Sequence, residues 1–188
     1  MTDFVLSSGN TIRPHRSPWG AFPIKGMKLS TGISSAVIRV GQTVVLDTGS
    51  TSYADSIIPC AQSSGSLNPA ANSIVGIAAE TPGAAGGNVG SGTTNTVGTV
   101  ITVWEANPNA EFKAWTKYGL LNSTIVGTPK ELHRDSTLNI DLVALRASSL
   151  GTPANCVIVT SLIDASGDSG GAVTFRFNTS SGFLAFYR

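Results

Sequence analysis

Charge is the scarcest property of this sequence. Only 12% of the 188 residues are charged, which is about half the share usual in globular proteins. Long solvent-exposed helices draw heavily on Glu, Lys and Arg, so the shortage argues against a helical protein. Lys and Arg nowhere form a run, and the formal net charge is +1. The sequence therefore gives no indication of a nucleic-acid partner.

Long apolar runs and a leader segment are lacking as well. No apolar stretch approaches the roughly 18 residues of a membrane-spanning helix. The first residues, MTDF, show no basic region followed by an apolar core, which a signal peptide would have. We therefore expect no membrane association and synthesis in a cytoplasm.

Cysteine is scarce too, since the chain has only two, Cys60 and Cys156. Both lie in apolar, strand-like surroundings, and in a cytoplasm we expect them to be buried, reduced thiols. No histidine lies near either cysteine in the sequence, so no standard zinc site is expected. No other metal site and no cofactor site is predicted.

The first 30 residues differ in character from the rest of the chain. Three prolines interrupt any regular element here, so we expect an extended N-terminal arm over residues 1–30 rather than a strand or helix. One domain is expected to follow over residues 31–188. The arm carries aromatic and basic residues that could anchor it to a neighbouring surface or equally to its own domain; these are Arg13, Arg16, Trp19 and Phe22.

From about residue 33 onward the sequence alternates apolar and polar residues or forms short β-branched runs between turns, which is typical of strands. Two hairpins are expected, around Gly41 and around Asn107–Asn109. Roughly ten short strands and no convincing helical pattern predict an all-β fold, an antiparallel barrel or sandwich. The predicted strands and hairpins cover residues 37–46, 73–79, 97–105, 110–117, 138–142, 156–162, 173–177 and 183–187.

Two segments are predicted to be long loops. Residues 81–96 are rich in Gly and Thr and are expected to be mobile or to lie on a partner. Residues 127–136 hold a dense polar cluster that includes His133, Arg134 and Asp135.

Gly167–Gly171 has the sequence GDSGG, which resembles the nucleophile motif of chymotrypsin-like serine proteases. That mechanism requires a histidine to accept the proton of Ser169 and a carboxylate to orient the histidine. His15 lies in the arm, His133 is too close before the serine for the order of that fold, and too few residues follow the serine. We therefore interpret the motif as a Gly-rich turn.

Asp47–Ser50 has the sequence DTGS and resembles the active-site loop of aspartic proteases. In those enzymes two aspartates share a proton. The chain contains one copy of the motif, so only a homodimer of the retroviral type could use it. We interpret the motif as the end of a strand followed by a turn. No catalytic residue is assigned, and we expect that the chain is not an enzyme.

The order of the strand patterns resembles that of the small β-barrel decoration, or cement, proteins of tailed bacteriophages. Residues 38–46 (IRVGQTVVL) resemble their opening hairpin and residues 73–78 (SIVGIA) their next strand. Residues 101–114 resemble the following hairpin, and residues 170–175 (GGAVTF) resemble a closing strand. Gln42 departs from the pattern, which favours Asp after the glycine. The arm is also longer than a minimal barrel needs.

This resemblance implies a non-catalytic structural protein of the virion that binds the outer surface of the capsid. It implies synthesis in the host cytoplasm, the major capsid protein as partner, and a homo-oligomer, with a trimer favoured over a dimer. A symmetric oligomer multiplies modest contacts through effective concentration. The four arm residues named above are the candidate contacts to the capsid or to a neighbouring subunit.

Other functions stay open at the level of the sequence. A tail or fibre component is a second virion role. A protease of either type would use the GDSGG or DTGS motif. A β-sandwich carbohydrate-binding module could present Trp104, Trp115 and Tyr118 as a sugar platform, although such aromatics more often lie in the core or pair across strands.

Overall fold

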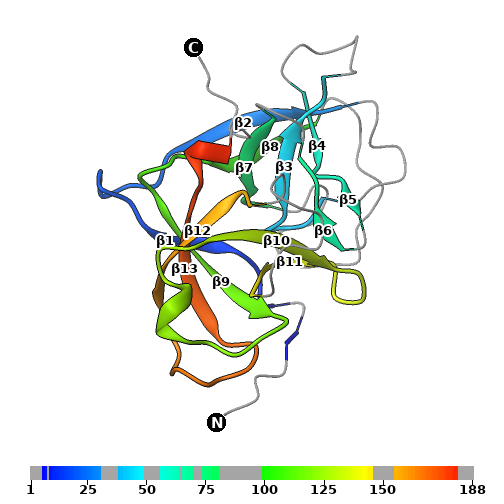
Figure 1. The fold of residues 1–188 in the computed structure, drawn as a ribbon. Coiled ribbons are helices and arrows are strands. Elements are labelled where there is room, and N and C mark those ends of the chain that lie inside the picture. The colour runs from blue at the N-terminus through cyan, green and yellow to red at the C-terminus, as the bar shows by residue number, and fades with distance from the viewer. Residues whose placement is uncertain are drawn as a thin grey trace.

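The computed structural model of the protein describes residues 6–7, 9–30, 38–48, 56–63, 65–69, 73–80, 99–145 and 155–181. Within these ranges every regular element is a strand except for two 3-10 turns, η3 (Ser123–Ile125) and η5 (Thr179–Ser181). The predicted all-β fold is therefore confirmed (Figure 1). The loop predicted at 81–96 and the closing strand predicted at 183–187 lie outside the described residues.

One group of strands forms a closed barrel, which we call the first barrel. Strands β2 and β4 pair in parallel, and the other pairs recorded around this barrel are antiparallel. Its interior is filled by apolar side chains such as Met27, Ile57 and Val103, all at most 1% exposed. In order around the barrel the strands are β2 (Ile24–Leu29), β4 (Ser56–Pro59), β3 (Thr43–Leu46), β7 (Ile74–Ala78) and β8 (Val100–Glu105).

The second group of strands forms an eight-stranded sheet that also closes on itself. Strand β11 (Ile140–Ala144) pairs antiparallel with β10 and parallel with β9, which completes a ring that we call the second barrel. The remaining strands follow one another in the order β1 (Arg13–Arg16), β9 (Glu111–Lys117), β13 (Ala172–Phe177), β12 (Val157–Leu162), β10 (Pro129–Asp135), β6 (Ser66–Leu67) and β5 (Gln62–Ser63).

The larger hydrophobic core joins side chains of both barrels. Phe112 and Phe175 stack with their ring centroids 5.6 Å apart, and Phe177 packs edge-on against Phe112. Val45 and Ile77 of the first barrel belong to the same buried cluster. Figure 1 shows β2, β3, β4, β7 and β8 in one part of the molecule and β1, β9, β12 and β13 in the other. Outward-facing residues of the first barrel are therefore buried wherever the second barrel covers them.

The prediction that the arm contains no strand is wrong. Arg13–Arg16 pairs with β9 as β1, and Ile24–Leu29 pairs with β8 and β4 as β2. A proline is compatible with β1 because this strand lies at the edge of its sheet, where a missing N–H leaves no ladder bond unmade. The segment thus packs on its own domain, one of the two alternatives that its sequence left open.

Both predicted hairpins are also corrected. The turn after Glu105 does not fold β9 back onto β8, because β8 pairs with β2 and β7 while β9 pairs with β1, β11 and β13. This turn instead carries the chain from the first barrel to the second. Around Gly41 the turn is present and β3 follows it, but residues 38–40 before it are not a strand, and residues 31–37 lie outside the described part.

The predicted loop at residues 127–136 is largely a strand, β10. Its polar residues predicted an exposed loop, but their side chains are buried and hydrogen-bonded inside the protein. Arg134 is 7% exposed and Asp141 on β11 is fully buried. The guanidinium donates to Asp141 from Nε at 2.7 Å and from Nη2 at 3.1 Å, which makes a two-pronged ion pair.

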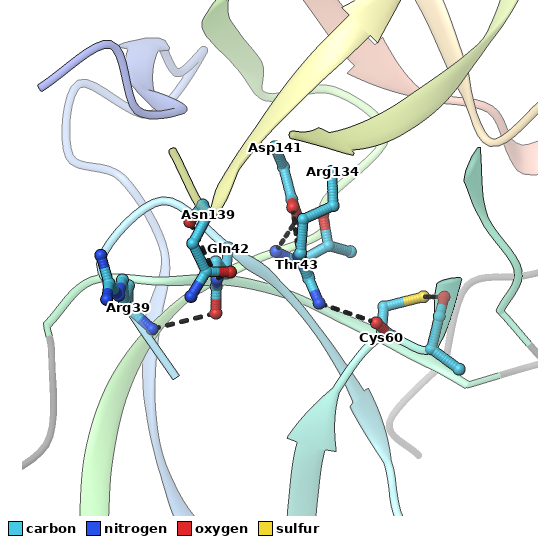
Figure 2. Close-up of polar contacts among 8 residues, drawn as sticks. Arg39, Gln42, Thr43, Cys60, Arg134, Asn139 and Asp141 are labelled. Carbon is cyan, nitrogen blue, oxygen red and sulfur yellow. Dashed lines mark hydrogen bonds and ion pairs between the residues drawn. The ribbon is translucent and has the colours of Figure 1, made fainter. Parts of the chain in front are cut away.

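This ion pair links the two barrels (Figure 2). The backbone N–H of Thr43 on β3 donates to Asp141 Oδ2 at 2.6 Å, and Arg134 Nη1 donates to the carbonyl of Cys60 after β4 at 3.0 Å. Burial alone would lower the pKa of Arg134, but the charge and hydrogen bonds of Asp141 outweigh burial and raise that pKa. Arg134 therefore remains charged in this buried position.

A second bridge runs beside the ion pair. The Gln42 side-chain amide donates to the Asn139 carbonyl at 3.0 Å and to its side-chain oxygen at 2.8 Å, and it accepts from the Arg39 N–H at 3.0 Å (Figure 2). Asn139 has a φ of 54°, a left-handed conformation that Asn tolerates better than most residues. Two adjacent turns, one from each barrel, are thereby fixed against each other.

We predict that Arg134→Met destabilises the protein far more than Lys117→Met. Removing Arg134 leaves the buried Asp141 charge without its cation, which costs about 3–5 kcal/mol. Lys117 pairs with Asp135 near the surface, where such a pair contributes less than about 1 kcal/mol. Urea unfolding followed by tryptophan fluorescence measures both changes, and equal losses for the two variants would contradict this role of the ion pair.

Candidate binding surface

The four predicted interface residues lie on β1 and on the connection from β1 to β2. Arg13, Arg16 and Trp19 are exposed, and Trp19 is 57% accessible. Phe22 turns inward instead and packs edge-on against Phe112, with the ring centroids 4.8 Å apart. The structure thus brings three of the four residues to one stretch of surface, while Phe22 fixes this stretch to the core.

Sequence analysis missed two exposed apolar side chains on the first barrel. On β2, Ile24 points outward and is 62% exposed, and on β8 Val100 is 57% exposed. Gly26 lies between them, and a Cβ on it would approach Val100 Cγ1 to 3.1 Å. The Val100 side chain therefore comes close to the Gly26 backbone. The alternation of exposed and buried residues in β2 was the available signal, but the arm interpretation obscured it.

The GDSGG segment is a turn between β12 and β13, as we interpreted it. The Gly167 N–H donates to the Leu121 carbonyl at 2.7 Å, the Leu121 N–H donates to the Asp168 carbonyl at 2.9 Å, and Ser169 bridges Leu120. Gly167 and Gly170 have φ of 98° and 71°, in the left-handed region that glycine favours. The connection, orange in Figure 1, lies at the end of the second barrel remote from the first.

The two histidines lie on separate strands. His15 is exposed on β1, whereas His133 on β10 is 4% exposed and its Nε2 is 3.0 Å from the Tyr118 hydroxyl. Within the described part of the chain no hydrogen bond joins the Ser169 hydroxyl to either histidine. The arrangement therefore offers Ser169 no base of the kind that acyl transfer needs.

Asp47 of the DTGS motif follows β3 directly and accepts a hydrogen bond from the hydroxyl of the buried Ser30. Its backbone N–H donates to the Ser56 carbonyl at 2.9 Å. Gly49 and Ser50 lie outside the described residues. In the described geometry the Asp47 carboxylate ties the end of β2 to the end of β3, which is a structural use of the group.

The three aromatics considered as a sugar platform have different surroundings. Trp104 on β8 packs against the large core cluster. Trp115 on β9 lies beneath the Lys113 ammonium, 4.7 Å from the ring centroid. Tyr118 contacts the His133 ring edge-on. The structure therefore does not gather them into one flat surface for stacking on a sugar.

Both cysteines are free and buried, as expected from the sequence. Burial raises the pKa of the Cys156 thiol to about 12 and raises that of Cys60 still further. Both groups are therefore protonated at any physiological pH. No group of three or more His, Cys, Asp or Glu residues in the described ranges is arranged to hold a metal ion.

No protein-family model matches the chain, and no curated protein is significantly similar to it in sequence. The described part of the chain contains no helix with the length and apolar character of a membrane span.

We predict that neither cysteine reacts with a thiol reagent while the protein is folded. A pKa of about 12 instead of 9.0 lowers the thiolate fraction of Cys156 about a thousandfold, in addition to blocked access. The reagent dithionitrobenzoate, followed by absorbance in mildly alkaline buffer, should react only after guanidinium unfolding. A Ser180→Cys variant supplies an exposed control thiol, and native wild-type protein reacting as fast as this control would disprove the prediction.

Proposed function

We propose that the chain is a structural protein of virus particles, a head decoration protein that binds the outer surface of the assembled capsid and stabilises it. The observation that carries this proposal is the exposure of three large apolar side chains: Trp19 on the connection from β1 to β2, Ile24 on β2 and Val100 on β8. Single exposed apolar residues are common, but several large ones on one paired strand face and on the connection leading into it favour a protein interface.

The way this surface is held supports the proposal. The segment that bears Trp19 is fixed at one end by β1 in the second barrel and at the other by β2 in the first. Phe22 anchors its middle to the Phe112 ring. A surface held at three points loses little conformational entropy on binding, which favours affinity for a repeated, rigid lattice.

The partner in this proposal is the major capsid protein, and the chain is a homo-oligomer, with a trimer favoured over a dimer. Oligomers that sit where several capsid subunits meet repeat the same contact about a symmetry axis. Modest contacts by each copy then add through effective concentration. In this view the role at the head is favoured over a role in the tail or fibre, because the resemblance is to head decoration proteins.

We predict that Trp19→Ser combined with Ile24→Ser weakens capsid binding by roughly a hundredfold, since two apolar anchors lose about 1–2 kcal/mol each. The measurement is co-sedimentation with heads of the virus that encodes the chain, prepared without this protein. Deleting residues 1–30 is not a suitable test, because it would remove β2 and open the first barrel.

The matched control for this experiment is Val126→Ser, which removes an exposed apolar side chain next to η3 instead. It should leave binding unchanged, and thermal unfolding should show that all variants fold. Light scattering measures the oligomer, and electron microscopy locates the added density. Density absent from the head surface, or equal losses for the control and the double variant, would refute the proposal.

The protease alternatives are tested separately. We predict that wild-type protein does not cleave unfolded protein substrates and that Ser169→Ala and Asp47→Asn have no effect in this assay. The reason is that the Ser169 backbone closes a turn and Asp47 accepts the Ser30 hydroxyl. A measurable activity that either substitution abolished would overturn the non-catalytic proposal.

A further inference from the structure

The cations of this weakly charged chain are unevenly placed on its surface. Cross-strand register puts Arg13 opposite Lys113 and Arg16 opposite Glu111. On the other side of β9, Lys113 lies opposite Thr174, so Arg176, two residues further along β13, points to the same face. This face of the second barrel carries four cations and one carboxylate, although the whole chain has a net charge of +1.

A β-bulge produces this arrangement. The register of β1 shifts between Pro14 and Arg16, so that His15 is the extra residue. In a regular strand, Arg13 and His15 would share a face. The bulge instead places Arg16 on the face of Arg13, opposite Glu111. Bulges re-aim side chains in this way and are frequent near binding sites.

The basic face has an internal electrostatic conflict. Like charges directly opposite one another on neighbouring strands destabilise a sheet, and Arg13 and Lys113 stand in that relation. Among the described residues no ion pair is recorded for Arg16, Arg176 or Glu111. An anionic ligand would relieve the repulsion between the cations and pair with Arg16 and Arg176.

Next to these cations the surface is hollowed. A depression of about 210 Å³ has Arg16 and Arg176 among its walls. A second one of about 340 Å³ shares Arg176 and the turn residues Pro108 and Asn109 with it. The two together form a groove from the end of β1 to the end of β13. The remaining walls of the first depression are Pro18, Pro108, Asn109 and Glu111.

We propose that this groove binds an extended acidic peptide segment, whose carboxylates pair with Arg16 and Arg176. The planar guanidinium matches a carboxylate in a two-pronged geometry. Proline rings offer apolar walls, and the side-chain amide of the exposed Asn109 offers hydrogen bonds to a peptide backbone. This inference goes beyond the proposed function, since it concerns the basic groove rather than the exposed apolar side chains and does not require a capsid.

A nucleic acid is the weaker candidate for this groove. Specific and non-specific duplex binding commonly neutralises about 6–10 phosphates, whereas this face offers four cations, of which Lys113 already lies over the Trp115 ring.

Fluorescence polarisation with a labelled hexaglutamate peptide tests the proposal on the intact chain. We expect salt-sensitive binding, no binding of hexaglutamine, and a loss of roughly tenfold or more for either Arg16→Gln or Arg176→Gln, because each removes a charge-assisted pair. Glu111→Gln should strengthen binding severalfold by removing the repelling carboxylate, a gain that unfolding cannot imitate. Lys28→Gln, the same charge change at an exposed site on β2, should leave the affinity within about twofold.

Three results would overturn the proposal. The first is that wild-type protein does not bind hexaglutamate at low ionic strength. The second is that Lys28→Gln weakens binding as much as Arg16→Gln, which would mean a general effect of net charge. The third is that a labelled oligothymidylate binds more tightly than hexaglutamate and loses affinity with the same two arginine variants, which would make the groove a nucleic-acid site.

Discussion

The interface between the two barrels depends on one buried ion pair. Asp141 on β11 receives two hydrogen bonds from Arg134 and a third from the backbone of β3, and the same arginine holds the carbonyl of Cys60. A buried carboxylate without such partners would be strongly unfavourable. The two barrels must therefore meet in the one register that satisfies it. The aromatic core between them supplies apolar burial, which is less directional.

The same scarcity of charge shapes the surface. Arg134 and Asp141 form an ion pair at the interface between the barrels, and Lys117 forms a second ion pair with Asp135 nearby. Four of the remaining cations lie on the basic face of β1, β9 and β13, while Ile24 and Val100 are exposed on the face of β2 and β8 that also carries Lys28. The molecule thus offers two different surfaces, and the two proposals assign a different partner chemistry to each. Their tests are independent because one uses capsids and the other uses a free peptide.

The resemblance to decoration proteins rests on strand order, and the structure alters what that order means. The segments 101–105 and 110–114 are both strands, but they belong to different barrels rather than to one hairpin. Gln42, which departs from the resemblance, donates hydrogen bonds from its side-chain amide to Asn139 across the interface between the barrels. These two features describe an architecture of two packed barrels. The proposal of a capsid role therefore draws its support from the exposed surface rather than from the hairpin pattern.

The sequence by itself determined the all-β class, the positions of β7, β12 and β13, the burial of both cysteines and the turn at GDSGG, because periodicity and turn chemistry are local properties. Only the tertiary structure decided which strands pair, because the alternation of apolar and polar residues along a strand is the same whichever strand lies beside it. Tertiary structure also explains why the polar segment of β10 is a buried strand, since Arg134 pairs there with Asp141. It likewise places arginines that are distant in the sequence on one face. Arg13 and Arg16 were predicted from local composition. Arg176 gave no such signal, because only strand pairing places it beside the other arginines. The alternation around Ile24 was obscured by the prolines that indicated an arm.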